Sequence, residues 1–197
     1  MGVVLLAAGM TFGQSYGGNN PGPIEREIEK ALSIDAEAFN LLYSATSLGQ
    51  MVMPFLVGPL IQRVGLAQAA VTLAGLVAVG QLLTSLAVQF GMFWGALAGR
   101  LLLGMGESVV ITQPCLLAQW LPSERFASAF GLILCVCKLL RVVNDNLEPF
   151  LFVRTGSLAI CFWFATGVAL FAVACALVLA RLTPPCPPAA LPPRSLR

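Results

Sequence analysis

The sequence predicts an all-α membrane protein, and two features of its composition carry this prediction. Of its 197 residues, 58% are hydrophobic and only 10% are charged, whereas a typical soluble domain is about 25% charged. The mean hydropathy is +0.87. A helix needs about 20 apolar residues to cross the hydrocarbon core of a bilayer, so this length holds roughly six spans with short loops. We therefore expect a six-helix transmembrane bundle.

The apolar segments divide the chain into six expected spans. The first span is short and ends in a run of glycine, asparagine and proline at 15–23, residues that typically interrupt a helix. Pro54 and Pro59 lie inside the second span, which membrane helices tolerate because neighbouring groups satisfy the freed carbonyls. The expected spans are about 3–19, 40–61, 69–90, 94–120, 126–152 and 157–182.

Two segments outside the spans have distinct compositions. Residues 25–37 hold five acids and two bases, so we expect a solvated loop or a short surface helix. Residues 183–197 contain six prolines and are expected to form a disordered tail. The arginines at 63, 125 and 181 favour a cytoplasmic side, which gives a short cytoplasmic N-terminus and a cytoplasmic C-terminal end.

The composition also excludes several classes of function. The net charge of +2 is too small to indicate nucleic-acid binding. The chain has no histidine, and its six cysteines lack the spacing of a metal site. No phosphate-binding loop and no nucleophile elbow is present. We therefore expect a protein that is not an enzyme, has no metal or cofactor, and has the lipid bilayer as its surroundings.

Two charged residues inside the fourth span mark a candidate site. Arg100 and Glu107 lie two helical turns apart on roughly the same face. A charge near the middle of a bilayer costs at least ~2.5 to 3.5 kcal/mol, so such groups face other helices or a water-filled path. Glu107 is thirteen residues from both Trp94 and Trp120, which places it near the midplane. Arg100 lies nearer one membrane face, as expected of a packing or gating residue.

The fifth span carries the opposite charge at a similar depth. Lys138 is thirteen residues beyond Arg125, so it also lies near the midplane. We expect Lys138 to pair with Glu107, either across a solvated substrate cavity or as a structural ion pair between two helices. Further polar groups follow on the fifth span, and others lie at the break of the first. The candidate substrate-binding residues are Glu107, Lys138, Arg141, Tyr16 and Asn144.

The loop between the second and third spans resembles a motif of the major facilitator superfamily of secondary transporters. This family carries a pattern close to G-x-L-x-D-R-x-G-R-[KR] there, and the chain matches it at Gly58, Leu60, Arg63 and Gly65. Gln62 replaces the acid of the pattern. The family's fourth span also carries R-x-x-x-G-x-G, and the matching residues here are Arg100, Gly104 and Gly106.

The resemblance implies the N-terminal half of a twelve-span transporter that works by alternating access. In that fold the six motif residues Gly58, Arg63, Gly65, Arg100, Gly104 and Gly106 serve packing and gating. A half of this kind is expected to pair with a second copy of itself or with a second half-transporter chain.

Further segments resemble the lysosomal dipeptide transporters of this superfamily. They are FGQSYGGNNP at 12–21, NLLYSATS at 40–47, Gly-Glu-Ser at 106–108, FGL at 130–132 and VNDNL at 143–147. This resemblance implies export of dipeptides from the lysosome, with a glycosylated lysosomal membrane protein as an accessory subunit. It implies that Glu107 binds the amino end of the dipeptide and that Lys138 binds the carboxylate.

Three departures from that family leave other functions open. The chain has one glycine fewer before Glu107, carries lysine instead of arginine at 138, and provides six spans instead of twelve. One alternative is a truncated, non-transporting half-bundle with a regulatory or scaffold role. Another is a transporter of a different small organic solute.

Overall fold

The computed structural model describes residues 2–19, 22–32 and 34–183, and every regular element in these residues is a helix. All of the expected proline-rich tail except Thr183 lies outside them. The elements are α1 Gly2–Met10, α2 Phe12–Gly17, the 3-10 helix η1 Gly22–Ile24, α3 Glu25–Leu32, α4 Ala36–Val64, α5 Leu66–Gln89, α6 Phe93–Gly106, α7 Val109–Trp120, α8 Ser123–Thr155 and α9 Leu158–Leu182.

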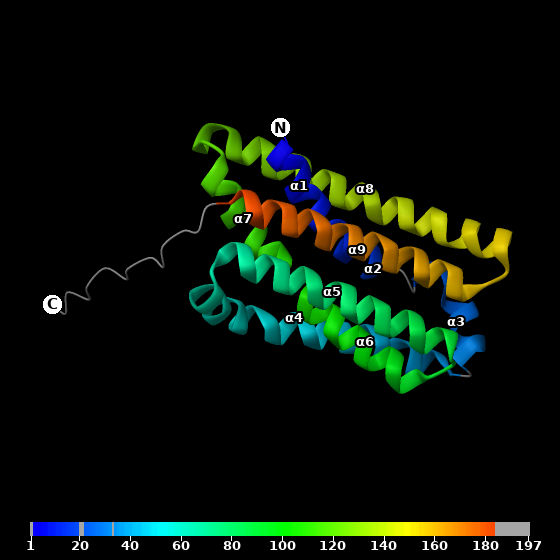
Figure 1. Cartoon of the computed structure of the whole chain (residues 1–197). Helices are drawn as coiled ribbons and strands as arrows, with labels where there is room; N and C mark the ends of the chain where they lie inside the picture. The colour runs from blue at the N-terminus through cyan, green and yellow to red at the C-terminus, as the bar shows by residue number, and fades with distance from the viewer. Residues whose placement is uncertain (1, 20–21, 33, 184–197) are drawn as a thin grey trace.

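The long helices run alongside one another in two groups (Figure 1). In one group α6 packs between α4 and α5. In the other group α1 and α2 lie between α8 and α9. The contact between α5 and α9 joins the groups. The buried apolar side chains are most numerous on α5 and α9, while α8 buries only Ile133, Asn144 and Glu148.

Within the described residues, five helical segments are long and apolar enough to cross a membrane. They are Ala36–Val64, Leu66–Gln89, Phe93–Trp120, Ser123–Thr155 and Leu158–Leu182. The first expected span, 3–19, instead folds as α1 and α2, which are 9 and 6 residues long and are separated at Thr11. Its side chains are buried from Ala7 to Gly17 except for Phe12, so α1 and α2 run through the interior of the second group.

The acidic segment 25–37 contains α3 and the start of α4. Ile28 and Leu32 of α3 are buried while its charged residues face outward, as in an amphipathic helix. Asp35 caps the N-terminus of α4 by accepting a hydrogen bond of 2.9 Å from the amide of Ala38. Because of this cap, α4 begins at Ala36, four residues before the expected boundary at 40.

Glycines allow α6 to approach α4 and α5 closely. A side chain at Gly104 would collide with the backbone carbonyl of Thr46 in α4, and one at Gly106 would lie 2.5 Å from the amide nitrogen of Val77 in α5. Gly80 of α5 faces α6 in the same way, 2.5 Å from the nitrogen of Leu103. Small residues at such crossings let membrane helices pack backbone against backbone. The missing side chains of Gly104 and Gly106 therefore leave room for this close approach.

Gly65 has a different role, because it forms the turn between α4 and α5 with φ +86 and ψ 159. This backbone conformation is accessible almost only to glycine. We expect Gly65→Ala to lower the free energy of unfolding by about 1 to 2 kcal/mol, measured by thermal unfolding in detergent. Gly58→Ala is the control, since a side chain there meets nothing within 4 Å and the position is helical. Equal stability of both variants would contradict this prediction.

Candidate functional site

Glu107 lies at a break in the fourth span. The expected span 94–120 is divided into α6 and α7 by a turn at residues 107 and 108. At this turn the backbone hydrogen bonds become three-residue bonds, from Ser108 to Met105 and from Val110 to Glu107, which tighten the helix. The Glu107 side chain is partly buried.

Three elements meet at the Glu107 carboxylate. The Gln50 amide of α4 donates a hydrogen bond of 2.6 Å to one carboxylate oxygen. The other oxygen lies against Gly18, just after α2, where an added side-chain carbon would come within 2.5 Å of it. Gly18 therefore provides room for this carboxylate at the end of the first span.

The Arg100 side chain binds the same end of the first span, at the C-terminus of α2. The side chain is 1% exposed, and its Nη1 donates to the carbonyls of Gly17 at 3.0 Å and Gly18 at 3.5 Å. These carbonyls lie at the C-terminus of α2, where the helix dipole favours a cation. Among the described residues, the Nε and Nη2 atoms of Arg100 have no hydrogen-bond partner. The arginine is therefore a helix cap that fixes the position of Gly18 beside Glu107.

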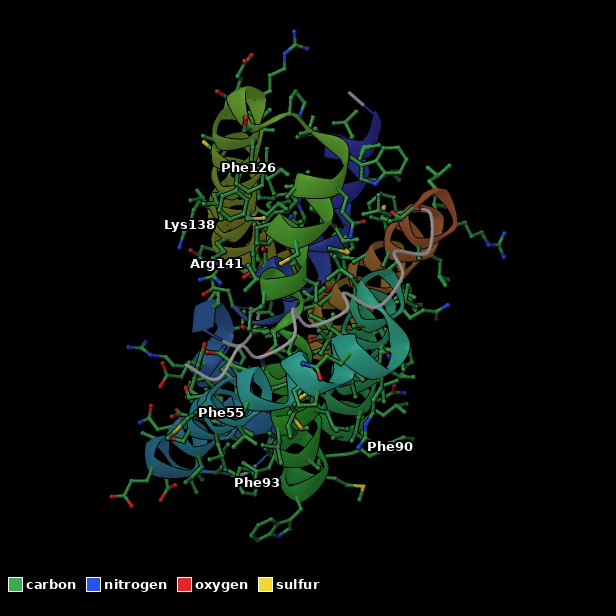
Figure 2. All side chains as sticks on the ribbon, turned by 90° about the vertical axis from the view of Figure 1, so that its left-hand side faces the viewer. Phe55, Phe90, Phe93, Phe126, Lys138 and Arg141 are labelled. Carbon is green, nitrogen blue, oxygen red and sulfur yellow. The ribbon has the colours of Figure 1, made fainter. Side chains whose placement is uncertain are left out.

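The next residue along the chain connects this site to α8. The Asn19 amide donates a hydrogen bond to the carboxylate of Asp145. Because Gly18 and Asn19 are consecutive, their Cα atoms are about 3.8 Å apart, which brings Glu107 close to the polar side of α8. Lys138, Arg141 and Asp145 are all exposed and share one face of α8 at helical spacing. Figure 2 shows Lys138 and Arg141 extending from the same side of the molecule.

We call the exposed and partly exposed side chains around this contact the polar face: Gln50, Glu107, Lys138, Arg141 and Asp145. Arg141 is one of the two cations whose field acts on the Glu107 carboxylate, and Arg100 is the other. Arg141 is four residues from Asp145, about 6 Å along the helix, whereas Lys138 is seven residues away, about 10 Å. Although both residues are described, no ion pair joins Glu107 to Lys138. Equal depth in the bilayer therefore does not place these two residues in direct contact.

Tyr16 and Asn144 do not lie on the polar face. Tyr16 is 2% exposed and Asn144 is fully buried, and both face Glu148, a buried carboxylate that the sequence analysis did not select. The Asn144 amide donates to Glu148 at 3.5 Å, and the Cys161 thiol donates to its backbone carbonyl at 3.8 Å. The four-residue spacing of Asn144 and Glu148 on an apolar helix is the sequence signal for this cluster.

The remaining motif residues lie at the end of α4. Arg63 is exposed and forms no ion pair with any residue of the described segments. Gly58 has open space around it. The described residues also contain no group of three or more histidine, cysteine, aspartate or glutamate side chains that could hold a metal ion.

Comparison with known proteins identifies the family. The sequence pattern described as Major Facilitator Superfamily matches residues 5–196. The chain belongs to the Major Facilitator Superfamily. The family and the fold class predicted from the sequence are thereby confirmed: this is a multi-pass helical membrane protein with the architecture of an N-terminal half of that superfamily. Family membership points to transport instead of catalysis.

Several relatives of known function are similar to this chain within the superfamily. The lysosomal dipeptide transporter MFSD1 of Mus musculus is 27% identical over 191 residues, which cover 91% of this chain and 41% of that protein. The protein of the same name from Homo sapiens is 28% identical over 158 residues, covering 79% of this chain and 34% of that protein. The one from Bos taurus is 29% identical over 191 residues, with 91% and 41% covered. The chain thus spans about two fifths of the length of the relatives that it matches most extensively.

Proposed function

We propose that this chain forms one half of a secondary transporter that moves dipeptides, or similar small zwitterionic or cationic solutes, across the lysosomal membrane by alternating access. The observation that carries this proposal is the polar face, which brings Glu107 close to Lys138 and Arg141 of α8. The name of the MFSD1 relatives, lysosomal dipeptide transporter, supports the substrate class and the lysosomal location.

A dipeptide has the charges that complement the polar face. Its ammonium group would bind the Glu107 carboxylate, which the Gln50 amide holds in place. Its carboxylate would bind Arg141, whose guanidinium can donate two parallel hydrogen bonds. Lys138 lies one turn before Arg141 on α8 and would add a second positive charge. Each charged residue would thereby gain a partner in a surrounding of low dielectric, where such pairs are strongest.

The second wall of the transport path would come from another bundle. In this superfamily two six-span halves rock against each other around a site near the midplane. A second copy of this chain or another six-span half could supply this bundle. We also expect a glycosylated lysosomal membrane protein as an accessory subunit, on the basis of the resemblance alone.

Glu107→Gln is expected to weaken dipeptide binding by about tenfold to a hundredfold. The substitution keeps the shape of the side chain but removes its charge, and a hydrogen bond to a charged group contributes about 1.5 to 3 kcal/mol. The measurement is binding of a radiolabelled lysine-containing dipeptide to the purified chain in lipid nanodiscs, together with uptake into vesicles. Glu124→Gln, at an exposed acid in the first turn of α8, is the matched control and should bind normally.

The same binding assay tests whether Arg141 binds the carboxylate of the dipeptide. Arg141→Gln should weaken binding of the dipeptide but leave binding of its C-terminal amide unchanged, because the amide lacks the negative charge. Absence of binding by the unmutated chain would exclude a dipeptide site and favour a non-transporting half-bundle. Binding without uptake would show that a second half is required. Binding that survives Glu107→Gln would exclude the proposed site.

A further inference from the structure

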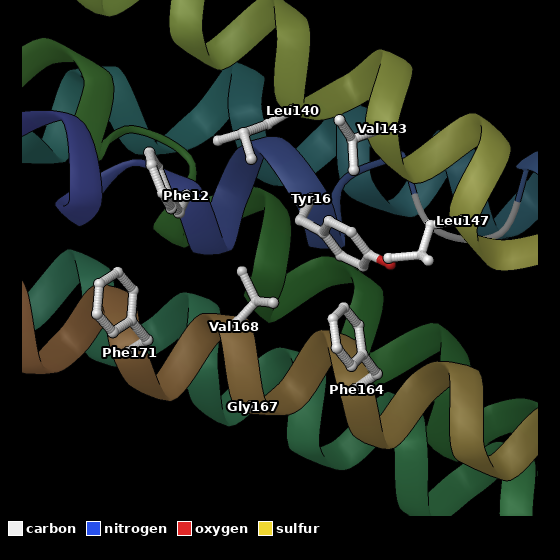
Figure 3. Close-up of a pocket in the computed structure, with 9 residues that line it drawn as sticks. All are labelled: Phe12, Tyr16, Leu140, Val143, Leu147, Phe164, Gly167, Val168 and Phe171. Atoms are coloured by element: carbon white, nitrogen blue, oxygen red, sulfur yellow. The ribbon is translucent and has the colours of Figure 1, made fainter. Parts of the chain in front are cut away.

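A groove lies between α8 and α9 with α2 as its floor (Figure 3). It encloses a cavity of about 390 Å³. We call it the α8–α9 groove and define it by the apolar residues Phe12, Leu140, Val143, Leu147, Phe164 and Phe171. Tyr16 also borders it, and every other lining side chain is apolar. An apolar cavity of this kind does not hold water well.

The groove faces away from the polar face. At 100° per residue, Leu140, Val143 and Leu147 lie on the side of α8 opposite to Lys138, Arg141 and Asp145. Phe164 is 44% exposed and Phe171 is 54% exposed, and both belong to a helix that spans the membrane. This chain therefore leaves the groove open on the outer surface of a membrane-spanning helix, on the side of α8 opposite to the proposed substrate site.

Beyond the groove, Arg154 lies on the same side of α8 as the residues that line the groove. Leu140, Leu147 and Arg154 are each seven residues apart and so share one side of the helix. Arg154 lies in the last turn of α8, about 10 Å beyond Leu147. Its guanidinium lies 5.3 Å from the centre of the Phe150 ring, and it is exposed at the membrane end of the helix. Phe150 is on this side too, so apolar surface leads from the groove to the arginine.

We propose that the α8–α9 groove binds a phospholipid of the bilayer, with an acyl chain in the groove and an anionic headgroup at Arg154. A groove lined by apolar side chains beside a membrane-spanning helix suits a lipid tail, and the guanidinium at the end of the same stripe complements a headgroup phosphate. The bound chain fills the space beside α8, which buries only three side chains of its own. The lipid thus holds α8 against α2 and α9.

Photo-crosslinking tests the tail site. The full chain is reconstituted in phosphatidylcholine vesicles that contain a minor fraction of phosphatidylglycerol with a diazirine near the end of one acyl chain. Peptides covering 140–147 and 164–171 should carry most of the label. Gly167→Leu should reduce this labelling severalfold, because Gly167 lines the groove and has open space around it. Gly75→Leu is the control, since Gly75 also has open space but lies in α5.

A second pair of variants tests the headgroup site. Arg154→Gln should lower the preference for the phosphatidylglycerol probe over an equivalent phosphatidylcholine probe by about fivefold. Arg181→Gln, in the last turn of α9, should leave the preference unchanged. Label spread evenly over all spans, or label in the groove that persists in Gly167→Leu, would overturn the tail site. Label on the other spans but none in the groove would show that a protein segment covers it. Equal labelling by the two probes in the unmutated chain would overturn the anionic headgroup.

Discussion

Gly104→Ala is expected to destabilise the protein by about 3 kcal/mol or more, although it adds a single methyl group. The new carbon would collide with the backbone carbonyl of Thr46, and a backbone atom cannot swing aside as the end of a long side chain can. Overpacking of this kind typically costs about 1 to 3 kcal/mol and occasionally more. Because α6 packs between α4 and α5, a shift of α6 away from Thr46 would also disturb its contacts with α5.

The measurement is thermal unfolding of the purified chain in detergent. For a chain of this size the melting temperature should fall by about 6 to 12 °C. Gly75→Ala is the matched control, because its added carbon meets nothing within 4 Å and alanine favours a helix over glycine by about 1 kcal/mol. The same chemical change is thus expected to have opposite signs at the two positions. A melting temperature of Gly104→Ala equal to or above that of Gly75→Ala would contradict the close packing of α6 on α4.

Arg100→Met is expected to destabilise the protein by about 3 kcal/mol. Methionine approximates the length of the arginine but donates no hydrogen bond, so the carbonyls of Gly17 and Gly18 lose their side-chain partner. Each buried group left unsatisfied costs about 1 to 3 kcal/mol. Removing a buried charge offsets part of this loss, but the Glu107 carboxylate also loses one of its two cations. The lost interactions are therefore expected to exceed the gain.

Two measurements test whether Arg100 acts through its hydrogen bonds to the end of α2 or only by filling space. Thermal unfolding should place Arg100→Lys between the unmutated chain and Arg100→Met, since lysine keeps the charge but lacks the planar fork of donors. Dipeptide binding should weaken in Arg100→Met even at temperatures where the variant is folded, because the position of Gly18 beside Glu107 depends on the arginine. A Met variant as stable as the unmutated chain would show that burying the charge costs as much as its hydrogen bonds contribute.

Hydropathy was sufficient to predict the membrane class and the approximate place of the long helices. It could not predict where helices break, because it averages over about 20 residues and does not register backbone geometry. The division of 94–120 at Glu107 is an example. Pro114 is the only proline in that segment and lies seven residues from the break. The interruption at Thr11 likewise carries no proline or glycine at its own position.

Residue counting predicts a depth for the candidate site but says nothing of its lateral neighbours. Counting residues from the tryptophans gives Glu107 and Lys138 the same predicted depth, which suggests direct contact between them. Contact depends on which helices are neighbours, and α8 packs on α1, α2, η1, α9 and, from the fourth span, on α7 and not on α6. Tyr16 and Asn144 were grouped with the polar residues near them in sequence. A step of one residue turns a helix by about 100°, which places Asn144 in the interior and Asp145 outside.

The sparse packing of α8 has a consequence for the order in which the bundle is built. α4, α5 and α6 hold one another through contacts between segments that are close in sequence, so this group is complete once α6 has been synthesised. The partners of α8 are α1, α2, η1 and α7, which precede it, and α9, which follows it. The groove that α8 shares with α9 does not exist until α9 arrives. We therefore expect α8 to be synthesised before α9, which forms the other wall of the groove. The packing of α8 is complete only when α9 has joined it.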